Sequence, residues 1–181
     1  MINISHIEKE NYVNGNGCRY VIWVQGCNFK CDDCWNKNTW DSNIKNIRNV
    51  TEMFNEILES DTINGVTFTG GEPLLQAEEL LILATLIKDK TDLGIHIFTG
   101  FELSENRTEI QNKLIKLADT IVFGRFNKKL PYNNQIVINQ TSDKWSYNNS
   151  DIEIDINDEL ELLFTGYPTD NLIQRIKECI K

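Results

Sequence analysis

Three cysteines lie close together in the first quarter of the sequence, and their side chains are the best suited to carry chemistry. Cys27, Cys31 and Cys34 are separated by three and two residues in one short loop. Thiolates are soft ligands that select zinc, copper(I) or iron–sulfur clusters. A closed structural zinc site needs four ligands, and no histidine lies near this loop. An iron–sulfur cluster with one iron open to a non-protein ligand therefore fits the spacing better.

Residues on both sides of the cysteines resemble the radical S-adenosylmethionine (SAM) superfamily. Segment 14–27 is similar to the glycine-rich entry, arginine and first strand of its glycyl-radical activating enzymes, above all those that act on anaerobic ribonucleotide reductases. Segment 34–41 is similar to the run of cysteine, aromatic residue, asparagine and then Thr-Trp in the same branch. Many superfamily members place an aromatic residue just before the third cysteine, whereas this chain has Asp33 there and Trp35 just after it. The resemblance implies that Asp33 and Trp35 bind the cofactor.

A second motif, Thr-Gly-Gly-Glu-Pro at 69–73, follows the next predicted strand. Paired glycines after a strand let the backbone approach a ligand without obstruction. Alone, such a motif is more typical of a structural turn, but its place one βα unit after the cysteines favours a ligand contact. The resemblance implies that Gly70, Gly71 and Glu72 hold the methionine end of SAM and that Thr99, at a later strand end, lines the same pocket.

Other residues of chemical interest carry weaker patterns. Cys18 stands where an aliphatic residue would serve and Cys179 lies far from the loop, so both are expected to be small apolar side chains rather than ligands. His96 alternates within a predicted strand, which favours a packed structural residue over an acid–base group. Arg125 follows a glycine in a segment similar to the family's Gly-Arg-aromatic run, and its role stays open between a cofactor contact and a solvated loop residue.

Length and charge narrow the function classes. The 181 residues, 40% of them hydrophobic, suffice for one domain with a core but are too few for a complete eight-unit barrel. A net charge of −9 disfavours a nucleic-acid surface. The amino terminus shows neither a basic region nor a long apolar stretch, so we expect no secretion signal and no membrane span. In a reducing cytoplasm, the expected location, clustered cysteines are ligands rather than disulfides.

Short β-branched runs alternate with helical patterns, which indicates a parallel α/β sheet. Apolar residues at helical spacing predict helices, and apolar runs between turn residues predict strands. The predicted helices are 50–59, 77–88 and 103–118, and the predicted strands are 20–25, 66–68, 94–98 and 119–126. Because ligands bind at the carboxyl ends of strands in such folds, the cysteine loop is expected at the functional end of the sheet.

The resemblance implies an α/β fold, an incomplete parallel β/α barrel of the radical SAM type with a carboxy-terminal hairpin and helix. One domain over 1–181 is expected, with a core at about 15–140 and an extension at about 150–181. Alternating apolar residues over 151–164 predict the hairpin. Thr169 or Asp170 is the expected N-cap of the last helix.

The function implied by the resemblance is mostly cofactor chemistry, with no catalytic residue beyond the cluster. One [4Fe-4S] cluster on the three cysteines would cleave SAM reductively to methionine and a 5′-deoxyadenosyl radical. That radical would remove a hydrogen atom from a glycine of a large partner, an anaerobic ribonucleotide reductase, with flavodoxin or ferredoxin as electron donor. Two alternatives stay open: a radical SAM enzyme acting on a small molecule or peptide, and a non-catalytic iron–sulfur or zinc protein, which the Gly-Gly-Glu segment disfavours.

Overall fold

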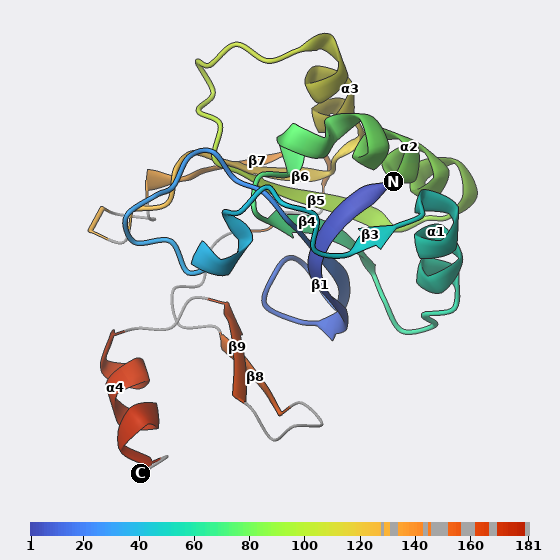
Figure 1. The fold of residues 1–181 in the computed structure, drawn as a ribbon. Helices are drawn as coiled ribbons and strands as arrows, with labels where there is room; N and C mark the ends of the chain where they lie inside the picture. Colours follow the sequence, from blue (N-terminus) through green and yellow to red (C-terminus); the bar gives the residue numbers. More distant parts are fainter. Residues whose placement is uncertain are drawn as a thin grey trace.

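A seven-stranded mixed sheet in the order β3-β1-β2-β4-β5-β6-β7 forms the centre of the structure (Figure 1). The computed structural model describes residues 1–127, 129–130, 134–142, 145, 152–156, 162–166 and 170–179. The strands of this sheet are β1 (Ile2–Asn11), β2 (Arg19–Val24), β3 (Ile47–Arg48), β4 (Gly65–Gly70), β5 (Gly94–Thr99), β6 (Thr120–Phe123) and β7 (Ile136–Asn139).

The four central strands β2, β4, β5 and β6 run parallel to one another, which confirms the predicted parallel α/β class. Their register aligns the strand ends, because Val24 pairs with Gly70 and Thr99 pairs with Phe123. We call this end of the sheet the carboxyl edge. The opposite end, where Arg19 pairs with Gly65 and Gly65 with Gly94, is the amino edge.

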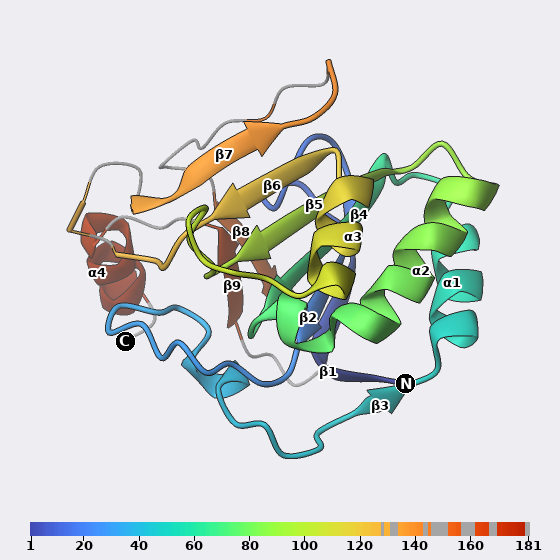
Figure 2. The ribbon, with the colours of Figure 1, turned by 90° about the horizontal axis from the view of Figure 1, so that it is seen from above.

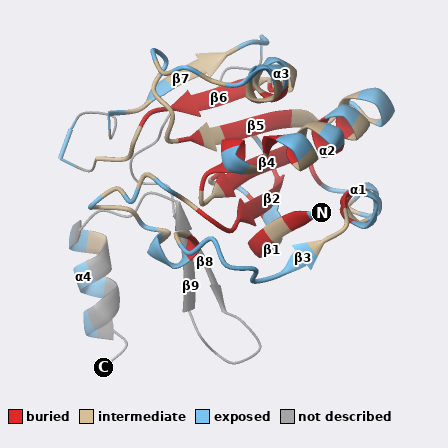
Figure 3. Cartoon of the chain, turned by 45° about the horizontal axis from the view of Figure 1, so that its top comes forward, coloured by how far each residue is buried: buried red, intermediate tan, exposed pale blue. Residues whose placement is uncertain are grey.

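Three helices cover one face of the sheet. They are α1 (Val50–Leu58), α2 (Ala77–Lys90) and α3 (Glu109–Leu117), and Figure 2 shows them side by side over the strands. Helix α1 begins where the Asn49 side chain accepts hydrogen bonds from the N–H groups of Thr51 and Glu52. Apolar residues of each helix pack against the alternate strand residues that face them, and burial concentrates on β2, β4, β5 and β6 (Figure 3). The predicted helices at 50–59 and 77–88 are thereby confirmed.

The opposite face of the central strands carries aromatic and polar residues. His96 is buried, stacks on Phe98 with ring centroids 4.7 Å apart, and meets the Trp145 ring edge-on. Burial and the charge of Arg19 hold the pKa of His96 well below its ordinary value. His96 is therefore a neutral, packed residue, as its position in the strand predicted.

Three strands and one helix boundary differ from the expectations. Segment 20–25 was expected to be the first strand, but β1 precedes it and pairs with β2 antiparallel. Strands β3 and β7 also pair antiparallel, at the two sides of the sheet. Helix α3 starts at Glu109 rather than near 103, because Thr108 and Gln111 form a capping box that fixes its beginning.

The predicted carboxy-terminal hairpin and helix are present as β8 (Ile152–Ile156), β9 (Leu162–Gly166) and α4 (Asp170–Cys179). Strands β8 and β9 pair antiparallel in a sheet of their own. The predicted cap Thr169 and the Cys179 side chain lie outside the described residues. Within the part of the chain that the structure describes, no helix has the length and apolar character needed to span a membrane.

Candidate functional site

The cysteine loop starts directly after β2, at the carboxyl edge. Gly26 adopts a φ of 101°, which L side chains rarely adopt, and turns the chain out of the strand. Its N–H donates to the Thr39 carbonyl at 2.7 Å, and the Cys27 N–H donates to the Trp40 carbonyl at 3.2 Å. The loop thus leaves the sheet and returns to its starting point, where the short 3-10 helix η1 (Lys37–Thr39) closes it.

The three thiols are partly exposed. Burial raises the pKa of the Cys27 and Cys31 thiols, while backbone N–H groups oppose the rise. The N–H groups near Cys27 belong to Phe29 and Lys30, and those near Cys31 belong to Phe126, beyond β6, and to Cys31 itself. Among the described residues, no three His, Cys, Asp or Glu side chains are placed to hold a single metal ion. The ligand set therefore stays a prediction from the spacing.

The chemistry of this loop fits an iron–sulfur cluster. Three soft donors come from eight consecutive residues, 27–34. Amide N–H groups beside the sulfurs of Cys27 and Cys31 favour the thiolate form, and such hydrogen bonds tune cluster potentials. The three cysteines are partly exposed, so this site is accessible from outside the protein.

The glycine pair after β4 packs against the backbone that carries the first cysteine. Gly71 N–H donates to the Val24 carbonyl at 2.8 Å, and the N–H of Glu72 donates to the Gly26 carbonyl at 2.9 Å. Gly70 has a φ of 98°, and a Cβ on Gly71 would collide with the Gly26 carbonyl oxygen. The side of Gly71 that a Cβ would occupy therefore faces protein backbone, and the contact of this glycine with SAM stays a prediction.

Glu72 is fully enclosed at the carboxyl edge, with 1% of its surface exposed. One carboxylate oxygen accepts hydrogen bonds from the Leu74 N–H at 2.9 Å and the Thr99 hydroxyl at 2.8 Å. The other accepts from the Gly100 N–H at 2.8 Å. Burial raises the pKa of Glu72 to about 7, although these donors act in the opposite direction. The carboxylate thus joins the end of β4 to the end of β5, and its contact with SAM stays a prediction.

The remaining predicted cofactor contacts fall into two places. Thr99 is buried beside Glu72, and its hydroxyl also accepts a hydrogen bond from the Phe101 N–H at 3.2 Å. Asp33 and Trp35 lie on the outer part of the loop, where Trp35 is 46% exposed. The structure therefore gathers Thr99 and the Gly-Gly-Glu motif near the start of the cysteine loop, and leaves Trp35 on the surface.

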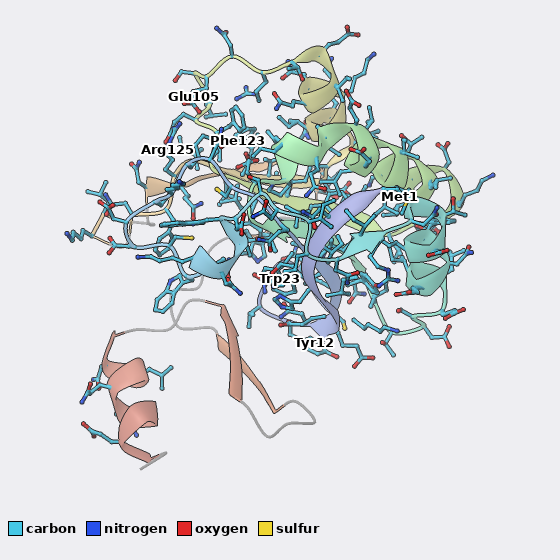
Figure 4. All side chains as sticks on the ribbon, in the orientation of Figure 1. Met1, Tyr12, Trp23, Glu105, Phe123 and Arg125 are labelled. Carbon is cyan, nitrogen blue, oxygen red and sulfur yellow. The ribbon has the colours of Figure 1, made fainter. Side chains whose placement is uncertain are left out.

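Phe29, which no sequence motif singled out, fastens the cysteine loop to the sheet. A Cβ on Gly100 would overlap the Phe29 ring, and the Phe101 ring meets it edge-on at 5.1 Å. The Arg125 guanidinium lies 4.4 Å from the centre of the same ring. Arg125 also pairs with Glu105 at 2.6 Å, and Figure 4 shows the labels of these two residues close together at its upper left. The available signal was an aromatic residue between the first two cysteines, flanked by the polar residues Asn28 and Lys30.

Comparisons with known proteins agree with this site. The sequence profile of a 4Fe-4S single cluster domain matches residues 13–145. The anaerobic ribonucleoside-triphosphate reductase-activating protein of Enterobacteria phage T4 is 32% identical over 136 residues, which cover 72% of this chain and 85% of that protein. The pyruvate formate-lyase-activating enzyme of Staphylococcus epidermidis is 39% identical over 101 residues, and the chain spans only 39% of its length.

A solved structure of QueE from Escherichia coli aligns with 67% of this chain at a TM-score of 0.44 and 21% identity. The family assignment rests instead on the profile, which matches well over half of the chain, and on the phage relative, which is matched over most of its length. The chain therefore belongs to the 4Fe-4S single cluster domain family and, within the radical SAM superfamily, to the branch of glycyl-radical activating enzymes.

Proposed function

We propose that this protein activates an anaerobic ribonucleotide reductase by generating a glycyl radical on it. One observation carries the proposal: the cysteine loop lies at the carboxyl edge beside the Gly-Gly-Glu motif, in a chain that matches a reductase-activating protein over 85% of that protein's length. The pyruvate formate-lyase-activating enzymes are matched over about two fifths of theirs, which favours the reductase as partner.

Three thiolates, from Cys27, Cys31 and Cys34, would hold one [4Fe-4S] cluster and leave one iron without a protein ligand. When bound, the cluster supplies an electron to SAM, whose cleavage yields methionine and a 5′-deoxyadenosyl radical that removes a hydrogen atom from a glycine of the partner. The electron would come from an external flavodoxin or ferredoxin. Only two cysteines, Cys18 and Cys179, lie outside the motif, which is too few to hold a second cluster that could relay electrons.

The residues of the carboxyl edge position this chemistry. Gly71 lets the end of β4 pack on Gly26, immediately before Cys27. Glu72 holds the first residues after β5 through Gly100. Together these contacts fix the start of the cysteine loop relative to the ends of β4 and β5. A cluster bound to the loop and SAM bound at the strand ends would therefore be held at a defined distance from each other.

The ligand assignment is tested by anaerobic reconstitution followed by iron and sulfide analysis. Cys27→Ala, Cys31→Ala and Cys34→Ala should each lose the cluster. Cys18→Ala is the matched control, because Cys18 is 4% exposed and packs in the hydrophobic core; it and Cys179→Ala should bind normal amounts of iron. A requirement for Cys18 or Cys179 would overturn the proposal, since a fourth thiolate would take the place of SAM.

The activity is tested with reduced protein, SAM and the candidate reductase. The mixture should release 5′-deoxyadenosine faster than the protein alone and show the doublet electron-spin-resonance signal of a glycyl radical on the reductase. A reductase with its radical glycine replaced by alanine should give no doublet. SAM cleavage without a partner radical would instead support the alternative of a small-molecule or peptide substrate.

A further inference from the structure

The tip of the cysteine loop is held by contacts that come from two other strands. The Phe29 ring rests on the backbone of Gly100 and meets the Phe101 ring, both of which follow β5. The Arg125 guanidinium, which follows β6, lies 4.4 Å from the ring centre. Cation–π contacts within about 6 Å are attractive, and arginine presents a flat face that stacks well on an aromatic ring.

Arg125 is itself fixed in place. Its guanidinium donates to the Glu105 carboxylate at 2.6 Å and lies 3.6 Å from the Glu102 carboxylate. The same Glu102 carboxylate accepts the Arg125 backbone N–H at 3.3 Å, and Glu105 accepts the Glu102 N–H at 2.8 Å. Two charged partners and a closed set of hydrogen bonds restrict the rotamers of the arginine, so the guanidinium can act as a fixed support.

This support acts close to two of the predicted ligands. Phe29 lies two residues from Cys27 and two from Cys31. The N–H of Phe126, the residue after Arg125, donates to the Cys31 thiol. Lys30, between Phe29 and Cys31, has a φ of 51°, a backbone conformation that needs support from its surroundings when the residue is not glycine.

We propose that Arg125 is a positioning residue for the cluster. By holding the Phe29 ring against the residues after β5, it sets where the Cys27 and Cys31 sulfurs stand relative to the carboxyl edge. The inference rests on the proposed role of the cysteines as ligands. It resolves the question that the sequence left open for Arg125 without requiring a contact between Arg125 and SAM.

Arg107 provides a matched control. Its guanidinium lies 5.2 Å from the Phe123 ring centre and donates to the Glu102 carbonyl at 2.9 Å, but no described contact joins it to the cysteine loop. Reconstituted Arg125→Gln and Arg107→Gln proteins are mixed with an iron chelator and the rate of iron release is followed. Loss of a cation–π contact should speed release from Arg125→Gln about two- to fivefold, whereas Arg107→Gln should release iron at the wild-type rate.

A spectroscopic readout separates positioning from stability. The electron-spin-resonance spectrum of the reduced cluster should change in Arg125→Gln and not in Arg107→Gln, while the melting temperatures of the two variants stay close to each other. Arg125→Lys keeps the positive charge but loses the planar guanidinium that stacks on the ring. Its spectrum and its rate of iron release should therefore be intermediate between those of wild type and of Arg125→Gln.

A double-mutant cycle tests the path through the ring. Phe29→Leu and Arg125→Gln should each speed iron release, and the double variant should be little faster than the more affected single variant, because both remove one contact. Additive effects, or equal effects of Arg107→Gln, would overturn the inference. Failure of the wild-type protein to bind iron would refute the proposed function itself, so the two failures are distinguishable.

Discussion

The two edges of the central sheet are each organised by one buried ionisable side chain, of opposite sign. At the amino edge, Arg19 is 5% exposed and donates to the carbonyls of Val66 at 2.8 Å and Gly94 at 3.0 Å. At the carboxyl edge, Glu72 accepts from backbone N–H groups at Leu74 and Gly100. Each side chain joins the ends of neighbouring strands through their backbone groups.

The difference in sign matches the backbone groups that each edge presents. Leu74 and Gly100, beyond the ends of β4 and β5, present N–H groups to Glu72, whereas Val66 and Gly94, at the beginnings of the same strands, present carbonyls to Arg19. A carboxylate therefore suits the carboxyl edge and a guanidinium suits the amino edge. The edge that presents N–H groups is also the one from which the thiols of the cysteine loop emerge, since Gly26 accepts the Glu72 N–H immediately before Cys27.

The largest effect is expected at the amino edge. Arg19→Met removes the charged donor from the carbonyls of Val66 and Gly94 and should lower the free energy of unfolding by roughly 3–4 kcal/mol. Urea unfolding of the apoprotein measures the loss. Lys113→Met is the control, since Lys113 is 58% exposed and forms an i,i+4 pair with Glu109, and should change stability by less than about 0.5 kcal/mol. A loss below about 1 kcal/mol for Arg19→Met would show that Arg19 does not organise this edge.

Gly71→Ala should disturb the carboxyl edge next most strongly. The new Cβ would collide with the Gly26 carbonyl, so the variant should lose about 1–3 kcal/mol of stability and bind less iron after reconstitution. Gly94→Ala at the amino edge is the control, because a Cβ there would meet no atom closer than 3.5 Å. Normal stability and iron content in Gly71→Ala, with impaired SAM binding, would restore the interpretation that the glycine makes room for the ligand.

Above a pH of about 7, where Glu72 is ionised, Glu72→Gln should lower the free energy of unfolding by about 1–2 kcal/mol, because one amide oxygen must replace two carboxylate oxygens. It should also remove a pH dependence. The folded-state pKa of about 7 lies above the ordinary value of 4.5, so the folded apoprotein binds more protons between these values, and its unfolding free energy falls as the pH rises through that window.

Urea unfolding of wild-type and Glu72→Gln apoprotein across this pH range measures the difference. The stability advantage of wild type over the variant should shrink as the pH rises from 4.5 to about 7 and stay constant above it. Glu109→Gln is the control, because hydrogen bonding to Lys113 lowers the pKa of this exposed carboxyl. A constant difference between wild type and Glu72→Gln would mean that the three donors keep Glu72 ionised throughout.

The smallest effects come from two threonines that bond the buried charges. Thr67 accepts from the Arg19 side chain at 3.2 Å, and Thr99 donates to Glu72 at 2.8 Å. Thr67→Val and Thr99→Val should each cost about 1 kcal/mol of stability. Only Thr99→Val should weaken SAM binding, measured by the change that SAM causes in the spectrum of the reduced cluster. Equal SAM binding by the two variants would remove the functional distinction between the edges.

Much of the fold was accessible from the sequence because its signals are local. Apolar spacing within α1 and α2 and the β-branched runs of the central strands predicted these elements correctly. Strand β1 was missed although it pairs with its sequence neighbour β2, because Glu8, Lys9 and Glu10 interrupt its apolar alternation. Strand β3 was missed because it has only two residues and its place depends on pairing with Ile2 and Asn3, far away in the sequence. The start of α3 was missed because the capping box at Thr108 was not recognised.

Local sequence set the ligand spacing of Cys27, Cys31 and Cys34 and the strand that precedes them, because both depend on consecutive residues. The tertiary structure alone decided what surrounds those cysteines. Glu72 reaches Gly100, and Phe29 lies under Arg125, only after β4, β5 and β6 align in register. Such partners are set by long-range strand pairing and burial, which no short stretch of sequence encodes.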